Sequence, residues 1–136
     1  MRVMKKMIYA ALCIVGILSF SCEKEKIETD PKKAILGKWE IVGKGNWPNM
    51  ESIIATGYTE YTPDSIIRFY DYELMQFTAP GKYWIEDSTL LISTLSEDGF
   101  EVVFEYKYDF FDNNNKLLLD VYAFMMFNTS IYKRLR

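Results

Sequence analysis

Residues 100–110, FEVVFEYKYDF, decide the fold class of this chain. Every second residue from Val102 to Phe110 is apolar or aromatic, and the residues between them are mostly charged. A period of two over so long a run is typical of a β-strand with one face on a core and the other in water, and a helix does not produce it. The stretch therefore predicts a long strand whose inward face carries an aromatic row, Phe104, Tyr106 and Tyr108.

Turn-forming residues divide the remainder of the chain from Leu36 onward into further strands. Thr62–Ser65, Glu86–Ser88, Ser96–Gly99 and Asp112–Asn115 have turn chemistry, and Pro80-Gly81 fits a type II turn. Residues 44–55 fit either a wide loop or a short helix that begins near Asn49. The strands expected between these marks are residues 37–43, 54–61, 65–72, 73–78, 82–86, 90–95, 100–110, 116–124 and 130–135.

Eight or nine short antiparallel strands in one domain predict an all-β fold. We expect an up-and-down barrel over residues 36–136, with a β-sandwich as the alternative. Closing the sheet into a barrel would remove the edges that so many strands otherwise expose. The aromatic content of 16% suits the half-buried surfaces of such a sheet.

The N-terminus has the layout of an export signal. Arg2, Lys5 and Lys6 precede an uncharged apolar stretch, Met7 to Phe20, and small Ser21 comes directly before Cys22. The apolar stretch is shorter than the roughly 20 residues of a spanning helix. Residues 1–21 are therefore predicted to be a cleaved lipoprotein signal peptide, after which Cys22 carries the lipid, palmitate among its acyl chains. The alternative is an ordinary secretory signal with an incidental Cys.

Residues 22–35 follow as a polar stretch with dense charge of both signs. Such a stretch cannot bury enough apolar surface to become ordered, so it predicts a flexible tether. Loss of the signal peptide leaves 13 basic against 19 acidic residues, a net charge of −6. A mildly acidic chain without a basic stripe is a poor partner for nucleic acid, and its membrane contact is expected from the lipid.

The residue inventory excludes much catalytic and metal chemistry. There is no His, and the two cysteines are Cys13 in the signal and Cys22. This removes His-based catalysis and the usual Cys/His zinc sites, so we expect no enzyme activity, no cofactor and no metal. Glu101 and Glu105 stand about 13 Å apart on one strand and are expected on a solvated outer face. Asp112–Asn115 is expected to be a turn, because it lacks the Gly and terminal Glu of a calcium loop.

Four segments of this domain resemble lipocalin-like lipoproteins of gut commensal bacteria. The stretch Leu36-Gly37-Lys38-Trp39 is similar to the G-x-W opening of that family, and residues 131–135 (IYKRL) resemble its closing strand. Residues 81–85 (GKYWI) and 89–92 (TLLI) are similar to its paired hairpin strands. The resemblance implies that Trp39 plugs the base of a barrel and that Arg134 packs over its indole.

The interior of an eight-stranded barrel is either filled by side chains or holds one small ligand. Phe104, Tyr106 and Tyr108, with Trp84, are the candidates to line an apolar pocket with phenol groups that orient a ligand. The alternative is that the row is solid core. A rim or partner surface is the expectation for Trp47, Pro48 and Met50, and for Tyr122, Phe124, Met125, Met126 and Phe127.

The sequence thus predicts a lipid-anchored protein of the cell envelope, in the outer membrane, that binds a small apolar molecule without catalysis. The alternative is a solid barrel that acts as a structural, interaction or inhibitory lipoprotein and contacts an envelope protein or a glycan.

Overall fold

The computed structural model describes residues 26–121 and 128–136. Its elements in chain order are α2 (Pro31–Ala34), β1 (Gly37–Asn46), β2 (Asn49–Ser52), β3 (Gly57–Tyr61), β4 (Ile66–Asp71), β5 (Gln76–Glu86), β6 (Thr89–Leu95), β7 (Glu101–Phe111), β8 (Lys116–Val121) and β9 (Thr129–Leu135). In these residues no helix has the length and apolar character needed to cross a membrane.

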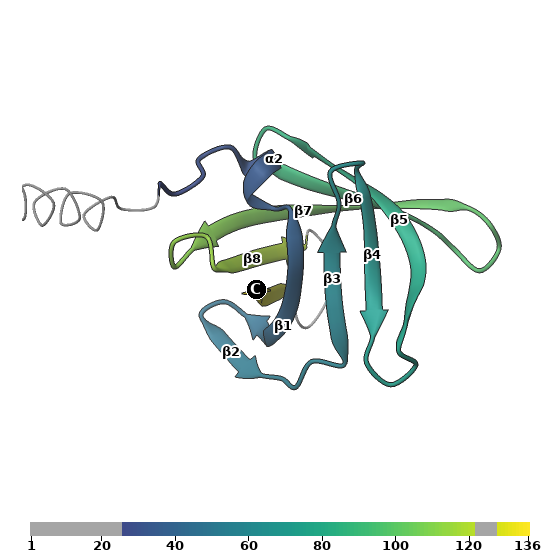
Figure 1. The fold of residues 1–136 in the computed structure, drawn as a ribbon, viewed down its shortest axis with the longest axis horizontal. Helices are drawn as coiled ribbons and strands as arrows, with labels where there is room; N and C mark the ends of the chain where they lie inside the picture. Colours follow the sequence, from purple (N-terminus) through teal and green to yellow (C-terminus); the bar gives the residue numbers. More distant parts are fainter. Residues whose placement is uncertain (1–25, 122–127) are drawn as a thin grey trace, which may run out of the picture.

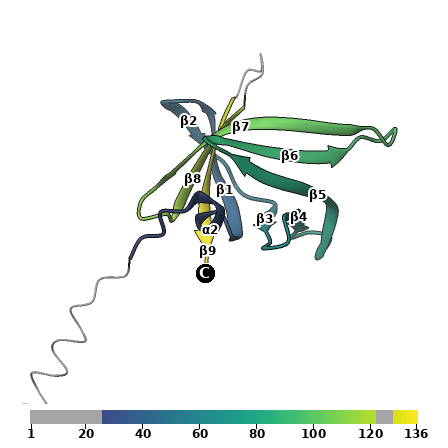
Figure 2. The same cartoon turned by 90° about the horizontal axis from the view of Figure 1, so that it is seen from above.

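The strands form one antiparallel sheet that closes on itself. Each strand from β3 to β9 pairs with the next along the chain, and β1 pairs with both β3 and β9. The result is an eight-stranded up-and-down barrel with β2 added to the far end of β1 (Figure 1). Figure 2 shows the β6–β7 hairpin projecting beyond the other strands. The all-β barrel is confirmed, and the sandwich alternative is wrong because a single sheet supplies every wall.

Strand β7 has the two faces that its sequence predicts. Val102, Tyr106, Tyr108 and Phe110 are partly buried, while the charged residues between them are exposed. The exception is Phe104, which lies on the inner face but is 43% exposed. The inner row therefore runs from an open end of the barrel at Phe104 to a filled end at Phe110.

The turn expected at Pro80-Gly81 is wrong. β5 runs unbroken from Gln76 to Glu86, so residues 73–78 and 82–86 are not separate strands. The β4–β5 register shifts at this point, since Ile67 pairs with Gly81 but Phe69 pairs with Thr78. This irregularity leaves Pro80 outside the paired positions, where its missing N–H costs no ladder hydrogen bond.

The turn that the sequence does not predict lies before β5. The Asp71 carboxylate accepts hydrogen bonds from the backbone N–H groups of Glu73 (2.9 Å) and Leu74 (3.0 Å). Met75 then has a left-handed φ of 52°. An aspartate that bonds its own backbone a few residues on makes a turn without Gly or Pro, which is why the boundary is hard to see in the sequence.

Residues 44–55 contain neither a helix nor a simple wide loop. β1 continues to Asn46 and returns as β2, with Gly45 paired to Met50 and Asn46 to Asn49. Trp47 and Pro48 form the turn of this hairpin. The added strand pair extends the wall at one end of the barrel.

Residues 31–35, which were expected to belong to a flexible tether, are part of the folded domain. Asp30 caps α2 by accepting a hydrogen bond from the Lys32 N–H (3.0 Å), and Pro31 occupies the first turn, where its missing N–H is not needed. Ile35, directly after the helix, is completely buried. The predicted boundary at residue 36 is therefore too late.

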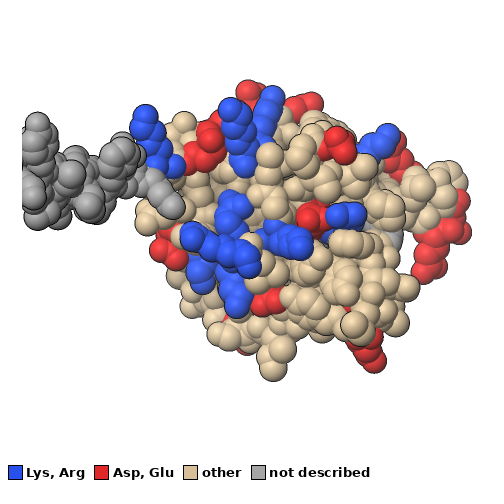
Figure 3. Space-filling view, viewed as in Figure 1, with Lys and Arg blue, Asp and Glu red and all other residues tan. Residues whose placement is uncertain are grey.

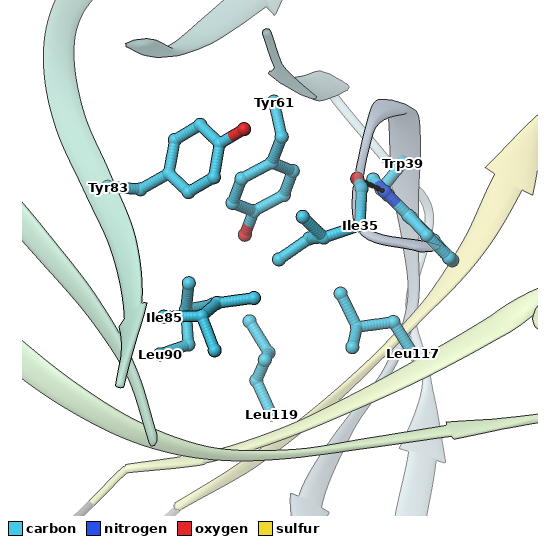
Figure 4. Packing of buried hydrophobic residues seen from close by; sticks show 8 residues of the cluster. All are labelled: Ile35, Trp39, Tyr61, Tyr83, Ile85, Leu90, Leu117 and Leu119. Carbon is cyan, nitrogen blue, oxygen red and sulfur yellow. Dashed lines mark hydrogen bonds between the residues drawn. The ribbon is translucent and has the colours of Figure 1, made fainter. Parts of the chain in front are cut away.

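The core lies between α2 and the barrel wall. Trp39, Ile35, Leu90 and Leu117 are the largest fully buried side chains. Figure 4 shows them with the other buried members of the cluster, Tyr61, Tyr83, Ile85 and Leu119. The described core side chains and the pairings that close the barrel lie within residues 30–136, so we expect a fragment that begins at Glu23 to fold on its own.

Candidate functional site

The barrel has one closed end, built around Trp39. The Trp39 indole N–H donates a 2.8 Å hydrogen bond to the Ile35 carbonyl, drawn in Figure 4, so the turn after α2 is fixed to the first strand. The Arg134 guanidinium carbon lies 4.3 Å from the centroid of the Trp39 ring. Phe110 approaches the indole from β7, with 6.1 Å between ring centroids. The structure therefore places Trp39 and Arg134 as the lipocalin resemblance implies.

Arg134 also connects three segments at this end through backbone carbonyls. Its Nη1 donates to Leu36 (2.7 Å), its Nη2 to Ala34 and its Nε to Asn114 (3.1 Å). Burial lowers the pKa of Arg134 from its usual value, and the neighbouring Arg136 adds to this effect. The three donor groups show why the planar fork of arginine suits this position better than lysine.

Gly37 makes this arrangement possible. Its φ of 116° lies in the left-handed region, and a Cβ there would come within 3.3 Å of Arg134 Nη1. The backbone conformation therefore favours glycine at this position, and any larger residue would also press on the guanidinium.

The other end of the barrel contains a cavity of about 300 Å³. Apolar side chains from five strands form most of its walls, and the polar lining consists of hydroxyl, amide and ammonium groups. The lining residues are Ile41, Lys44, Thr59, Tyr61, Ile67, Ile92, Phe104, Tyr106, Leu119, Val121, Asn128, Ser130 and Tyr132. An apolar enclosure with a few polar groups is typical of small-molecule sites, and this volume is at the lower limit of the roughly 300–1,000 Å³ they occupy.

Three phenols, of Tyr61, Tyr106 and Tyr132, are gathered in this cavity. Burial raises the pKa of Tyr61 well above its usual value, and the adjacent Tyr132 and Tyr106 contribute. Burial likewise raises the pKa of Tyr106, and that of Tyr132 to about 12. The three groups stay protonated at neutral pH, and as O–H groups they can donate hydrogen bonds to a guest molecule.

Of the four residues predicted to line a pocket, two line this cavity. Phe104 stands at its mouth and Tyr106 is further inside. Tyr108 lies nearer the closed end, where its hydroxyl donates to the Asp87 carbonyl (2.8 Å) and its ring packs on Phe110. Trp84 alternates with inward Tyr83 and Ile85, so it faces outward and borders a separate hollow near α2. The prediction is therefore wrong for Tyr108 and Trp84.

The most informative lining residue that sequence reasoning missed is Lys44. Simple alternation from Trp39 and Ile41 would put Gly43 inside and Lys44 outside. The β1–β9 register shifts between Ile41 and Gly43, however, so the bulge at Val42 returns Lys44 to the inner side. Val42 and Gly43 accordingly border a shallow hollow elsewhere, with Trp47 and Met50. Tyr61, Leu119 and Tyr132 obey the period of two, and their strand patterns would have identified them.

The residues predicted as a rim divide between two places. Trp47 is 60% exposed on the β1–β2 hairpin, beside partly buried Met50, and Pro48 completes the exposed turn. Tyr122, Phe124, Met125, Met126 and Phe127 lie outside the described residues. The hairpin thus provides a small apolar surface next to the hollow that Val42 and Gly43 border.

The outer face of β3, β4 and β5 carries an aromatic cluster, made of Tyr58, Tyr70, Tyr72 and Phe77. Tyr58 and Tyr70 are stacked at 5.1 Å, and Phe77 meets Tyr70 edge-on at 5.2 Å. Arg68 lies over the Phe77 ring at 3.9 Å and pairs with Glu60. Tyr72 and Phe77 are each 41% exposed, so a partner can reach the rings.

The acidic segments have the arrangement expected of surface residues. Glu101 and Glu105 are both exposed on β7. Asp112, Asn113 and Asn114 have left-handed φ values of 52°, 53° and 61° and form the β7–β8 turn. Within the described part of the chain, no three acidic side chains gather as a cation site requires.

The surface in Figure 3 carries charge of both signs. Basic side chains gather over β1 and around the C-terminus, and acidic ones lie at the end where the β6–β7 hairpin projects. Exclusion of nucleic acid stays a prediction from the net charge.

A scan against protein-family models finds no match to this chain, and a search of curated proteins finds none either.

Proposed function

We propose that this protein is a non-catalytic carrier or sensor that takes one small apolar molecule into the open end of its barrel. The observation that carries the proposal is the cavity of about 300 Å³, with walls of Ile, Leu, Val and Phe side chains and three protonated phenols among them. Apolar walls supply affinity by removing hydrocarbon from water, and the hydroxyl groups orient the guest.

The composition of the cavity favours binding over catalysis. Its described lining has no carboxylate, imidazole or thiol, so it lacks the groups that general acid–base or nucleophilic chemistry most often uses. The similarity of its opening and closing segments to lipocalin-like lipoproteins supports the same conclusion.

We further propose that the barrel is attached to the cell envelope, at the outer membrane, by lipid on Cys22. The support is the order of basic, apolar and small residues before Cys22. The folded domain begins near Asp30, so only a short stretch of chain separates it from the anchor.

The proposal is tested by titrating the fragment from Glu23 with a fluorescent apolar dye and by native mass spectrometry of the same fragment. A preformed cavity predicts saturable binding at one site, and a copurified small molecule would identify the natural guest. If wild type shows no saturable binding while Tyr106→Ala creates it, the barrel is solid and the proposal is wrong.

Two matched variants locate the site. Tyr106→Phe and Tyr108→Phe each remove one hydroxyl from the same row of β7, but only Tyr106 lines the cavity. Affinity for a guest with a polar group should change in Tyr106→Phe and stay at the wild-type value in Tyr108→Phe. Equal effects of the two variants would place the bound probe elsewhere.

The outer aromatic cluster favours a second candidate function, contact with an envelope protein or glycan. Exposed rings supported by an arginine are typical of such surfaces. Tyr70→Ser with Phe77→Ser should abolish binding on a glycan array or cross-linking to envelope proteins. The same double variant should leave dye binding in the cavity unchanged.

A further inference from the structure

Among the described residues that line the cavity, Lys44 is the one with a charged side chain. The bulge at Val42 turns it inward, and Lys44 is paired in register with Ser130 of β9, another lining residue. Its side chain is exposed, so it stands at the mouth of the cavity and not on its floor.

Within the described residues, Lys44 forms no ion pair with a carboxylate. Glu51 is opposite Lys44 in the β1–β2 hairpin, yet no ion pair joins them, and Glu51 borders the hollow next to Trp47 instead of the cavity. The other polar lining groups near the β9 end, Asn128 and Ser130, are uncharged. The described lining of the cavity therefore combines one ammonium group at the mouth with apolar walls and no carboxylate.

We propose that Lys44 makes the cavity selective for apolar molecules that carry an anionic headgroup, a carboxylate in particular. This inference rests on the proposed function, since it specifies the class of guest for the same cavity. The headgroup would bind Lys44 at the mouth, and the apolar body would extend toward Tyr106 and Leu119. A charge-assisted hydrogen bond beside low-dielectric walls favours a carboxylate over an alcohol of the same length, and the ammonium repels an amine.

The test compares decanoate, 1-decanol and decylamine as competitors of the fluorescent dye, using the fragment from Glu23. These probes share one alkyl chain and differ in the charge of the headgroup. In wild type, decanoate should bind about fivefold more tightly than decanol, the upper range for a partly exposed ion pair, and decylamine most weakly. High salt should reduce the preference for decanoate, because it screens the headgroup interaction.

Variants then assign the preference to Lys44. Lys44→Met should remove the preference for decanoate over decanol, whereas Lys44→Arg should retain it. Lys82 is exposed on the outer side of β5, so Lys82→Met is the matched control and should behave as wild type. If Lys44→Met does not fold, as judged by circular dichroism, the three probes are compared on the wild-type fragment at two salt concentrations. That comparison still tests whether the cavity prefers the anionic headgroup.

The outcomes separate the two proposals. If none of the three probes displaces the dye and the dye itself does not saturate, the proposed function fails. If all three bind with equal affinity in wild type, or if Lys82→Met loses the preference as fully as Lys44→Met, the cavity binds apolar molecules but the role of Lys44 is overturned.

Discussion

The Arg134 guanidinium carbon lies 4.3 Å from the centroid of the Trp39 ring, although the two residues are at opposite ends of the domain sequence. Their strands pair with Trp39 directly opposite Arg134, so this contact belongs to the seam that closes the barrel. The same guanidinium holds the carbonyls of Ala34 and Leu36, which ties α2 to the seam. The contacts of Trp39 and Arg134 therefore stabilise the closed end of the barrel, at a distance from the cavity at the other end.

Replacing Trp39 by Ala should lower the free energy of unfolding by about 3–5 kcal/mol, because it removes a completely buried indole. Urea denaturation measures the loss. Trp47→Ala is the control and should change the value by at most about 0.5 kcal/mol, since Trp47 is 60% exposed. Similar small losses for both variants would show that Trp39 is not the plug of the barrel.

Arg134→Met should cost about 2–4 kcal/mol, because it removes the cation–π contact and leaves carbonyls without their donors. Arg134→Lys keeps the charge but not the fork, so it should recover less than half of the loss. Arg136→Met removes an exposed hydrogen bond to Asn115 and a like charge near Arg134, and it should change stability by at most about 0.5 kcal/mol. Full recovery by lysine would mean that charge alone matters here.

Stability should fall at alkaline pH through the cavity phenols. Tyrosine in the unfolded chain ionises near pH 10, whereas burial raises the pKa of folded Tyr132 to about 12. The folded state then binds more protons between these values, so the stabilisation is fully present below about pH 10 and is lost as pH rises through 12.

Tyr132→Phe should flatten this decline in unfolding free energy, as measured by urea denaturation at several alkaline pH values. An ultraviolet titration of tyrosinate should also lose one of the phenols that titrate near pH 12 in the variant. The urea-unfolded chain is the reference, in which the tyrosines titrate together. If the unfolding free energy of Tyr132→Phe falls with alkaline pH as steeply as that of wild type, the raised pKa of Tyr132 does not cause the decline.

Cys22→Ser should release the protein from membranes and abolish incorporation of labelled palmitate, because Cys22 is the predicted lipid attachment site. Cys13→Ser is the control, and it should keep both the label and the membrane fraction. Membrane association that persists in Cys22→Ser, together with an unlabelled wild type, would contradict the lipoprotein assignment.

The sequence was most reliable where one local pattern decides the structure. The alternation in Val102–Phe110 is enough to predict β7 and its inner face, because side chains in a strand alternate strictly between the two sides. Residues 36–39 and 131–135 likewise led to the Trp39–Arg134 pair through their similarity to a known family. Part of the cavity followed too, since Phe104 and Tyr106 belong to the predicted row.

By itself the sequence determined that this chain forms an all-β domain of antiparallel strands, because strand periodicity and turn residues act over a few neighbours. A barrel was expected with a sandwich as the alternative, and the place of Trp39 at its base came from the family resemblance. Only the tertiary structure decided which groups meet in the cavity. The bulge at Val42 and the irregularity beside Pro80 depend on how β1 and β5 register with β9 and β4, and a one-residue shift exchanges the two faces of a strand. That is why Lys44 faces the cavity and Trp84 does not, and why Ile35, in a stretch that looks like a tether, is part of the core.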